Sequence, residues 1–175
     1  MISRHRHTIR LSKHDYTSPK TYFVTIGTFH HYQLLGEIKN KNIIPNKIGK
    51  IIEEILISLP KHHHCQLDTY QIMPNHLHFI LEILVPIVGA QRAAPLHEWG
   101  IQPDSLPCII RSFKSECTKQ IHEQKIYFAK IFQRNYYEHI IRDKEDLVKC
   151  QKYILTNPQN WFYDKENQNN IKKTL

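Results

Sequence analysis

The chain has 175 residues, a length that suits one compact domain, and 41% of them are hydrophobic, which is enough for a core and excludes a wholly disordered chain. Lysine and arginine number 24 against 16 acidic residues, so the formal net charge is +8 and the pI is about 9.3. This charge favours a polyanionic partner such as nucleic acid, although a basic protein without a specific partner stays open.

The expected location follows from cysteine usage and from the hydrophobic runs. The basic residues 1–10 lack the apolar stretch of a signal peptide, and the longest apolar run, 79–90, is too short to span a bilayer. No C-x-x-C pair occurs among the four cysteines, Cys65, Cys108, Cys117 and Cys150. We therefore expect a soluble, cytoplasmic protein with reduced thiols and no membrane partner.

The first third of the chain predicts an arm, a strand, a hairpin and a helix. Residues 1–20 are basic and polar and are expected to form an N-terminal arm. Residues 22–30 are β-branched and aromatic and predict a strand, and residues 37–44, with Asn-Lys-Asn between two short apolar pieces, predict a hairpin. Isoleucine and leucine recur at helical spacing through 46–59, and Pro60 is expected to end that helix.

The middle of the chain predicts two paired strands, an irregular segment and a second helix. Residues 65–73 and 76–83 have strand character and are joined by the turn dipeptide Pro74-Asn75. Residues 85–107 contain four prolines and two glycines, so we expect an irregular insertion. A helix with a continuous apolar stripe is predicted over 105–122.

The last third predicts one more extended segment and a third helix. Residues 126–141 are expected to be extended, with a break at 133–135. Asp143 is a good N-cap for a helix that is expected to end near Asn157, because Pro158 follows. This order of elements predicts a single α+β domain over 1–175: a ferredoxin-like or RRM-like antiparallel sheet with helices on one face.

The pair His76 and His78 is the first candidate site. Residues two apart in a strand point to the same face, so both imidazoles project together while Leu77 and Phe79 pack on the other face. Two converging imidazoles make half of a metal site. With 13 histidines in the chain, two hydrogen-bonded sheet histidines remain an alternative at this point.

Tyr153 and Asn157 are the second candidate. Their i, i+4 spacing places them on one side of the last predicted helix, at the margin of the face turned toward the core. A packed tyrosine followed by a helix-ending asparagine is the alternative.

Basic and aromatic residues are the third candidate. Tyr136, Tyr137 and His139 lie between Arg134 and Arg142, and aromatic side chains among cations suit stacking on unpaired bases. A solvated basic surface is the alternative for each cation. The candidates for phosphate contacts are Arg4, Arg6, Arg10, Arg111, Lys114, Lys119, Arg134 and Arg142.

Several of these pieces together resemble one family. Residues 70–81, with the string M-P-N-H-L-H, are similar to the HUH motif of single-strand tyrosine transposases. Two further segments resemble the REP-associated tyrosine transposases: F-Q-R-N-Y-Y-E-H-I-I-R-D at 132–143 and Y-I-L-T-N-P at 153–158. Residues 22–26 and 110–115 are also similar, so the resemblance covers nearly the whole chain in order.

The resemblance implies an HUH endonuclease fold and a role for each candidate. His76 and His78 would bind Mg²⁺ or Mn²⁺, and Tyr153 would attack a phosphodiester of single-stranded DNA near a hairpin. A 5′-phosphotyrosine and a free 3′-hydroxyl would result. In insertion-sequence relatives a glutamine one turn after the tyrosine completes the metal site; here that position is Asn157, whose amide oxygen can also bind a hard cation. Relatives act as monomers or as homodimers.

Four alternatives stay open. Tyr136 and Tyr137 compete with Tyr153 as the nucleophile. The chain could be another HUH enzyme such as a plasmid replication initiator, although relaxases usually place the tyrosine before the histidine pair. A non-catalytic RRM-like nucleic-acid-binding module would explain the net charge and the aromatic residues. It would not explain the pair His76 and His78 or the pair Tyr153 and Asn157. A zinc hydrolase would need a third ligand beside the histidines and no tyrosine.

Overall fold

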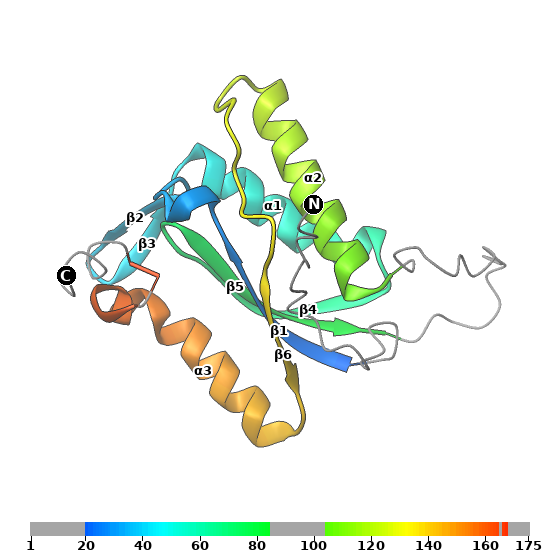
Figure 1. Cartoon of the computed structure of the whole chain (residues 1–175). Helices are drawn as coiled ribbons and strands as arrows, with labels where there is room; N and C mark the ends of the chain where they lie inside the picture. The colour runs from blue at the N-terminus through cyan, green and yellow to red at the C-terminus, as the bar shows by residue number, and fades with distance from the viewer. Residues whose placement is uncertain (1–19, 85–103, 165, 168–175) are drawn as a thin grey trace, which may run out of the picture.

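The computed structural model describes residues 20–84, 104–164 and 166–167 (Figure 1). Residues 1–19 of the predicted arm and 85–103 of the predicted insertion lie outside the described residues, and Arg4, Arg6 and Arg10 lie there too. Among the described residues, no helix is long and apolar enough to cross a membrane.

A four-stranded antiparallel sheet forms the centre of the molecule. Its strand order is β4-β5-β1-β6, with β1 at Lys20–Gly27, β4 at Cys65–Ile72, β5 at His76–Ile83 and β6 at Tyr137–Ile141. A separate hairpin pairs β2, Gly36–Lys39, with β3, Asn42–Pro45. The α+β class and the antiparallel sheet are therefore confirmed, and β5 and β1 are its two central strands.

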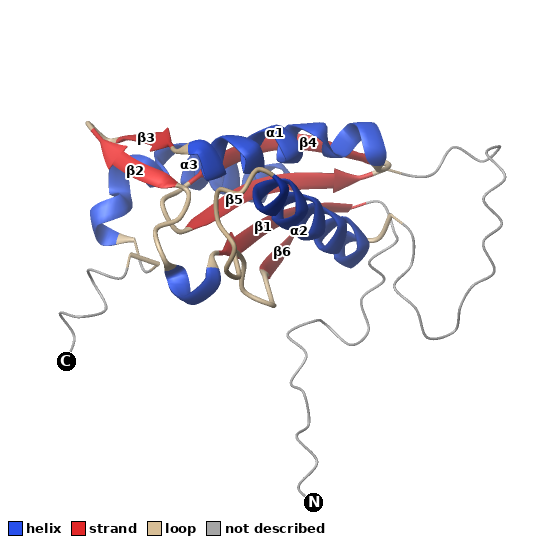
Figure 2. Ribbon diagram, turned by 90° about the horizontal axis from the view of Figure 1, so that it is seen from above, coloured by secondary structure: helices blue, strands red, loops and turns tan. Residues whose placement is uncertain are grey.

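The three helices divide between the two faces of the sheet. Helices α1, Lys47–His62, and α2, Leu106–Glu123, cover one face, and α3, Lys144–Asn160, packs on the other (Figures 1 and 2). The expectation that the helices share one face is thus wrong in this respect. The reason lies in β5, whose residues 76–81 are buried on both faces, so that each face needs its own cover.

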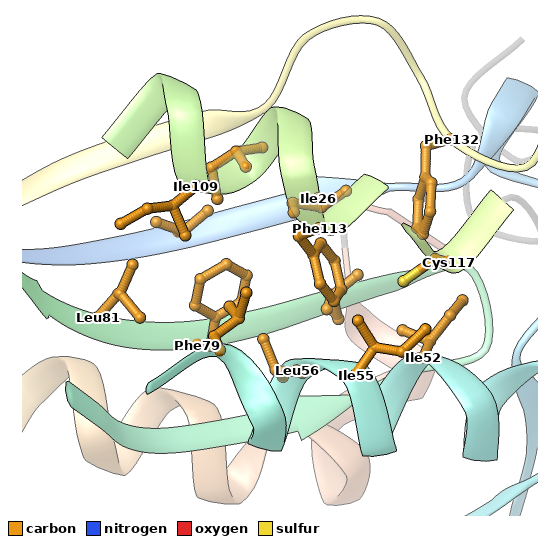
Figure 3. Packing of buried hydrophobic residues seen from close by; sticks show 14 of the residues in the cluster. Ile26, Ile52, Ile55, Leu56, Phe79, Leu81, Ile109, Phe113, Cys117 and Phe132 are labelled. Atoms are coloured by element: carbon orange, nitrogen blue, oxygen red, sulfur yellow. The ribbon is translucent and has the colours of Figure 1, made fainter. Parts of the chain in front are cut away.

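Most of the hydrophobic core lies between the sheet and the first two helices. The ring of Phe79 of β5 packs at a tilt against that of Phe113 of α2, with the ring centroids 6.4 Å apart. Ile52 and Leu56 of α1 belong to the same layer (Figure 3). A smaller cluster beneath α3 contains Phe23, Ile80 and Ile154. The thinner apolar cover on the α3 face leaves room there for polar side chains.

Two helices continue past the prolines that we expect to end them. Helix α1 includes Pro60 and ends at His62, and α3 includes Pro158 and ends at Asn160 before a short 3₁₀ turn, Trp161–Tyr163. A proline cannot donate to the preceding turn, but its fixed φ is helical, so a chain near its helix end can keep turning for two residues. Asn157 consequently lies inside α3, not at its end.

Two strands, β1 and β6, end or begin at other residues than predicted. Strand β1 ends at Gly27, after which Thr28 and Phe132 form an isolated bridge, and β6 comprises only residues 137–141 of the predicted 126–141. Helix α2 begins at Leu106, so the last two residues of the predicted insertion belong to the helix. Pro107 is tolerated there because first-turn N–H groups have no helical partner.

Candidate metal and nucleophile site

The two histidines of β5 converge beneath α3. His76 is fully buried and His78 nearly so, and their Nε2 atoms lie 2.9 Å apart. Leu77 and Phe79 belong to the core on the opposite face, as the alternation of the strand predicts. The imidazoles therefore face each other in a protected place, which is the arrangement that two ligands of one cation require.

Hydrogen bonds determine which ring nitrogen of His76 carries the hydrogen. The Asn75 side-chain nitrogen Nδ2 donates to the carbonyl oxygens of His31, at 3.2 Å, and of Glu166, at 2.5 Å, which sets the orientation of the amide. Its oxygen Oδ1 then faces His76 Nδ1 at 2.8 Å and can only accept, so Nδ1 carries the hydrogen. The lone pair of His76 is thereby left on Nε2, inside the site.

His78 has a partner that can serve either tautomer. Its Nδ1 lies 2.8 Å from the hydroxyl oxygen of Thr25 on the neighbouring strand β1. Without a cation, His78 Nε2–H can donate to His76 Nε2 while the Thr25 hydroxyl donates to Nδ1. With a cation on Nε2, the hydrogen moves to Nδ1 and the hydroxyl accepts it. Thr25 therefore supports the ligand form of His78.

Both imidazoles are held neutral by their surroundings. Burial lowers the pKa of His76 to about 4, against the opposing influence of the Asp164 carboxylate. Burial also lowers the pKa of His78, and the neighbouring His76 adds to this effect. Because only neutral imidazole binds a metal ion, the pair is ready to act as ligands at neutral pH.

Asn157 and Tyr153 reach the same place from α3. Asn157 is buried, its Nδ2 lies 3.5 Å from His78 Nε2, and among the described residues its Oδ1 has no hydrogen-bond partner. A buried amide oxygen without a donor is costly unless a cation or water satisfies it. Tyr153 and Asn157 thus lie on the face of α3 that is turned toward His76 and His78.

Tyr153 lies at the entrance, half exposed, with its ring centroid 5.2 Å from that of His78 and 5.9 Å from that of Phe23. Desolvation raises the pKa of its phenol, and the Asp164 carboxylate raises it further, while a hydrogen bond from Asn157 lowers it in part. The tyrosine accordingly needs positive charge nearby before it can act as a nucleophile.

An open pocket of about 790 Å³ lies over these residues. His78, Tyr153 and Asn157 line one part of it, and Tyr137 and Tyr163 line another. Tyr137 is 57% exposed and Tyr163 is 81% exposed, so much of each residue is open to solvent. Pockets of this volume accommodate small ligands or single nucleotides.

Asp164 is an acidic neighbour that the sequence does not predict. Its carboxylate oxygen Oδ2 lies 3.9 Å from His76 Nε2, and one donor atom from each of His76, His78 and Asp164 lies within 4.8 Å of the other two. The residue follows the 3₁₀ turn after α3, and no regular spacing relates it to the histidines. Thr25 and Asn75 are missed for a similar reason, since the contact of Thr25 depends on the register between β1 and β5 and those of Asn75 depend on the carbonyls of two distant loops.

The predicted DNA contacts are dispersed. Arg111 and Lys114 belong to α2, on the sheet face opposite the pocket, whereas Arg134, Tyr137 and Arg142 are exposed near β6. His139 lines the pocket, but its Nε2 lies 2.9 Å from a carboxylate oxygen of Asp146. Tyr136 packs against the core.

Lys114 has a different environment from the one expected. Its ammonium donates to the carbonyl oxygens of Gln133, Arg134 and Asn135 at 2.9, 3.4 and 3.0 Å, and it lies over the ring of Tyr136. Burial, with Lys130 nearby, lowers the pKa of Lys114 to about 8. Because its three donors face the protein, this geometry does not support the predicted phosphate contact.

Comparison with known proteins places the chain in a family and identifies its fold. No family model matches it. An uncharacterised protein of Haemophilus influenzae (strain ATCC 51907 / DSM 11121 / KW20 / Rd) is 34% identical over 167 residues, which cover 91% of this chain and 92% of that protein. A REP-associated tyrosine transposase bound to a REP hairpin is similar in structure, with a TM-score of 0.59 at 18% identity over 90% of this chain and 77% of that one.

The chain belongs to the family of the Haemophilus protein and has the fold of a REP-associated tyrosine transposase. At 18% identity the structural likeness concerns the fold, while roles for individual side chains depend on the geometry of the site itself.

Proposed function

We propose that this protein is a metal-dependent single-strand DNA transposase that cleaves and rejoins DNA through a 5′-phosphotyrosine intermediate. The observation that carries the proposal is the convergence of the neutral pair His76 and His78 with Asn157 and Tyr153. His78, Asn157 and Tyr153 line the pocket, and His76 lies buried directly behind His78. The fold of a REP-associated transposase supports it independently. An RRM-like binding module would have no need for two buried histidines whose Nε2 atoms lie 2.9 Å apart.

Mg²⁺ or Mn²⁺ fits the donor set. Two imidazole nitrogens and a buried amide oxygen without a partner suit a divalent cation, and His76 and His78 already have the outer hydrogen bonds that metal ligands usually need. Such a cation supplies positive charge that polarises the phosphoryl oxygens and offsets the charge developed in the transition state.

Tyr153 is the proposed nucleophile. Its phenolic oxygen attacks the phosphorus and loses its proton, the bond from phosphorus to the 3′-oxygen breaks, and that oxygen takes up a proton to become a free 3′-hydroxyl. The phosphate stays on the tyrosine with the 5′ side of the DNA. Attack by a second 3′-hydroxyl reverses the step and joins new ends. Asn157 donates to the phenolic oxygen and so helps to orient it.

Single-stranded or hairpin DNA is the proposed partner. The exposed residues Tyr137 and Tyr163, which line the pocket, suit stacking on unpaired bases. Arg134 and Arg142 are exposed cations that precede and follow β6 in the chain. The similar transposase is bound to a REP hairpin, which makes a hairpin the first ligand to test. Arg111, on the far side of the sheet, is a candidate for contacts with a longer DNA.

The test is an adduct assay with single-stranded DNA taken from the flanks of the gene. Wild type is incubated with Mg²⁺, with Mn²⁺ or with chelator, beside Tyr153→Phe and His76→Ala. We expect a covalent protein–DNA band that resists denaturation, requires the cation and is absent from both variants. DNA binding by wild type without any band, on every flanking hairpin, would instead support the RRM-like module.

A further inference from the structure

We propose that Asp164 is a ligand of the metal centre, which makes the donor set two histidines, one carboxylate and one amide. This inference rests on the proposed function, and it assigns a role to the short segment after α3. The carboxylate lies nearly buried, with a side-chain exposure of 5%, and its Oδ2 lies 3.9 Å from His76 Nε2. One small displacement of the side chain would bring Oδ2 to the point that both imidazoles face.

The carboxylate is held in a fixed orientation. Its other oxygen, Oδ1, accepts a hydrogen bond of 2.8 Å from the backbone N–H of Glu166, so Oδ2 is the atom directed at the histidines. Glu166 in turn is anchored beside the site, because its carbonyl oxygen accepts from Asn75 and its carboxylate lies 2.8 Å from His31 Nδ1. The segment that holds Asp164 is therefore tied to the same turn that orients His76.

Charge explains why a carboxylate belongs here. Two neutral imidazoles and an amide carry no formal charge, so a buried divalent cation bound by them alone would be uncompensated. Mg²⁺ and Mn²⁺ prefer oxygen ligands, and two histidines with one carboxylate form a recurrent site with open positions for substrate. The DNA phosphate can then occupy one of those positions beside Tyr153.

The experiment measures Mn²⁺ binding to the full-length protein without DNA. Isothermal titration and the loss of the free-Mn²⁺ EPR signal are recorded for wild type, Asp164→Asn and His76→Ala. The control is Glu145→Gln, which removes the same charge from an exposed position in the first turn of α3. We expect Asp164→Asn to weaken binding at least about tenfold, His76→Ala to abolish it, and Glu145→Gln to leave it unchanged.

The outcomes separate this inference from the proposed function. Wild-type affinity in folded Asp164→Asn, with binding lost in His76→Ala, would overturn the role of Asp164 and leave the proposed centre intact. Unchanged affinity in His76→Ala would overturn both. If Asp164→Asn does not fold, Asp164→Glu replaces it: retention of the charge should keep Mn²⁺ affinity within about tenfold of wild type, and a loss as complete as in His76→Ala would contradict the inference.

Discussion

Replacing the Thr25 hydroxyl should weaken metal binding without disturbing the fold. Thr25→Val keeps the β-branched shape that suits strand β1 but removes the only group seen 2.8 Å from His78 Nδ1 among the described contacts. In the ligand form of His78, the Nδ1 hydrogen then has no acceptor in a nearly buried place. Loss of such an outer hydrogen bond typically costs about 10- to 100-fold in metal affinity, or about 1.4–2.7 kcal/mol.

The assay is a calorimetric titration of the Thr25→Val variant with Mn²⁺. Thr21→Val is the matched control, because Thr21 lies on the same face of β1 but pairs with Glu82 and Ile141, away from the histidines. We expect the dissociation constant to rise about 10- to 100-fold for Thr25→Val and to stay at the wild-type value for Thr21→Val. Equal constants in the two variants would refute the tautomer argument for His78.

Three further predictions concern the proposed nucleophile Tyr153, the half-buried Lys114 and the pocket-lining Tyr137. Tyr153→Phe should abolish adduct formation. It should change the free energy of unfolding by less than about 0.5 kcal/mol, because Tyr153 is half exposed. A larger loss of unfolding free energy in urea denaturation would reveal a structural role for the hydroxyl. Lys114→Met should lower the free energy of unfolding by about 2 kcal/mol, because three carbonyl oxygens lose their donor. Lys119→Met, on the exposed side of α2, should leave the free energy of unfolding unchanged. A salt-dependent loss of DNA affinity in Lys114→Met at unchanged stability would contradict the structural role of Lys114. Tyr137→Ala should weaken single-strand binding by about 1–3 kcal/mol in fluorescence anisotropy, with Phe128→Ala, exposed outside the pocket, as its control; equal affinities would exclude stacking at Tyr137.

Local periodicity made the paired side chains predictable from the sequence. The period of two in a strand places His76 and His78 on one face, and the helical spacing places Tyr153 and Asn157 on one side of α3. These statements need only the type of each element, and the structure has both pairs on facing surfaces. Their chemical roles stay predictions until the adduct and metal assays are done.

Contacts between distant segments could not be predicted in the same way. Thr25 meets His78 only because β1 and β5 pair in one particular register, and Asp164 reaches His76 only because α3 passes Pro158 and turns back. The direction of Lys114 depends on the path of residues 133–135 beneath it. Spacing along one chain segment carries no information on such pairings, and this is where the sequence-based description was incomplete.

The most direct test of the central claim is to locate the DNA on the protein. The covalent adduct formed with Mn²⁺ is digested with nuclease and trypsin, and the nucleotide-bearing peptide is sequenced by mass spectrometry. Trypsin should release residues 153–165 and 135–142 as separate peptides, and fragmentation distinguishes Tyr153 from Tyr163 within the first. We predict a nucleotide on Tyr153. A nucleotide on Tyr136, Tyr137 or Tyr163 would contradict the assignment of the nucleophile.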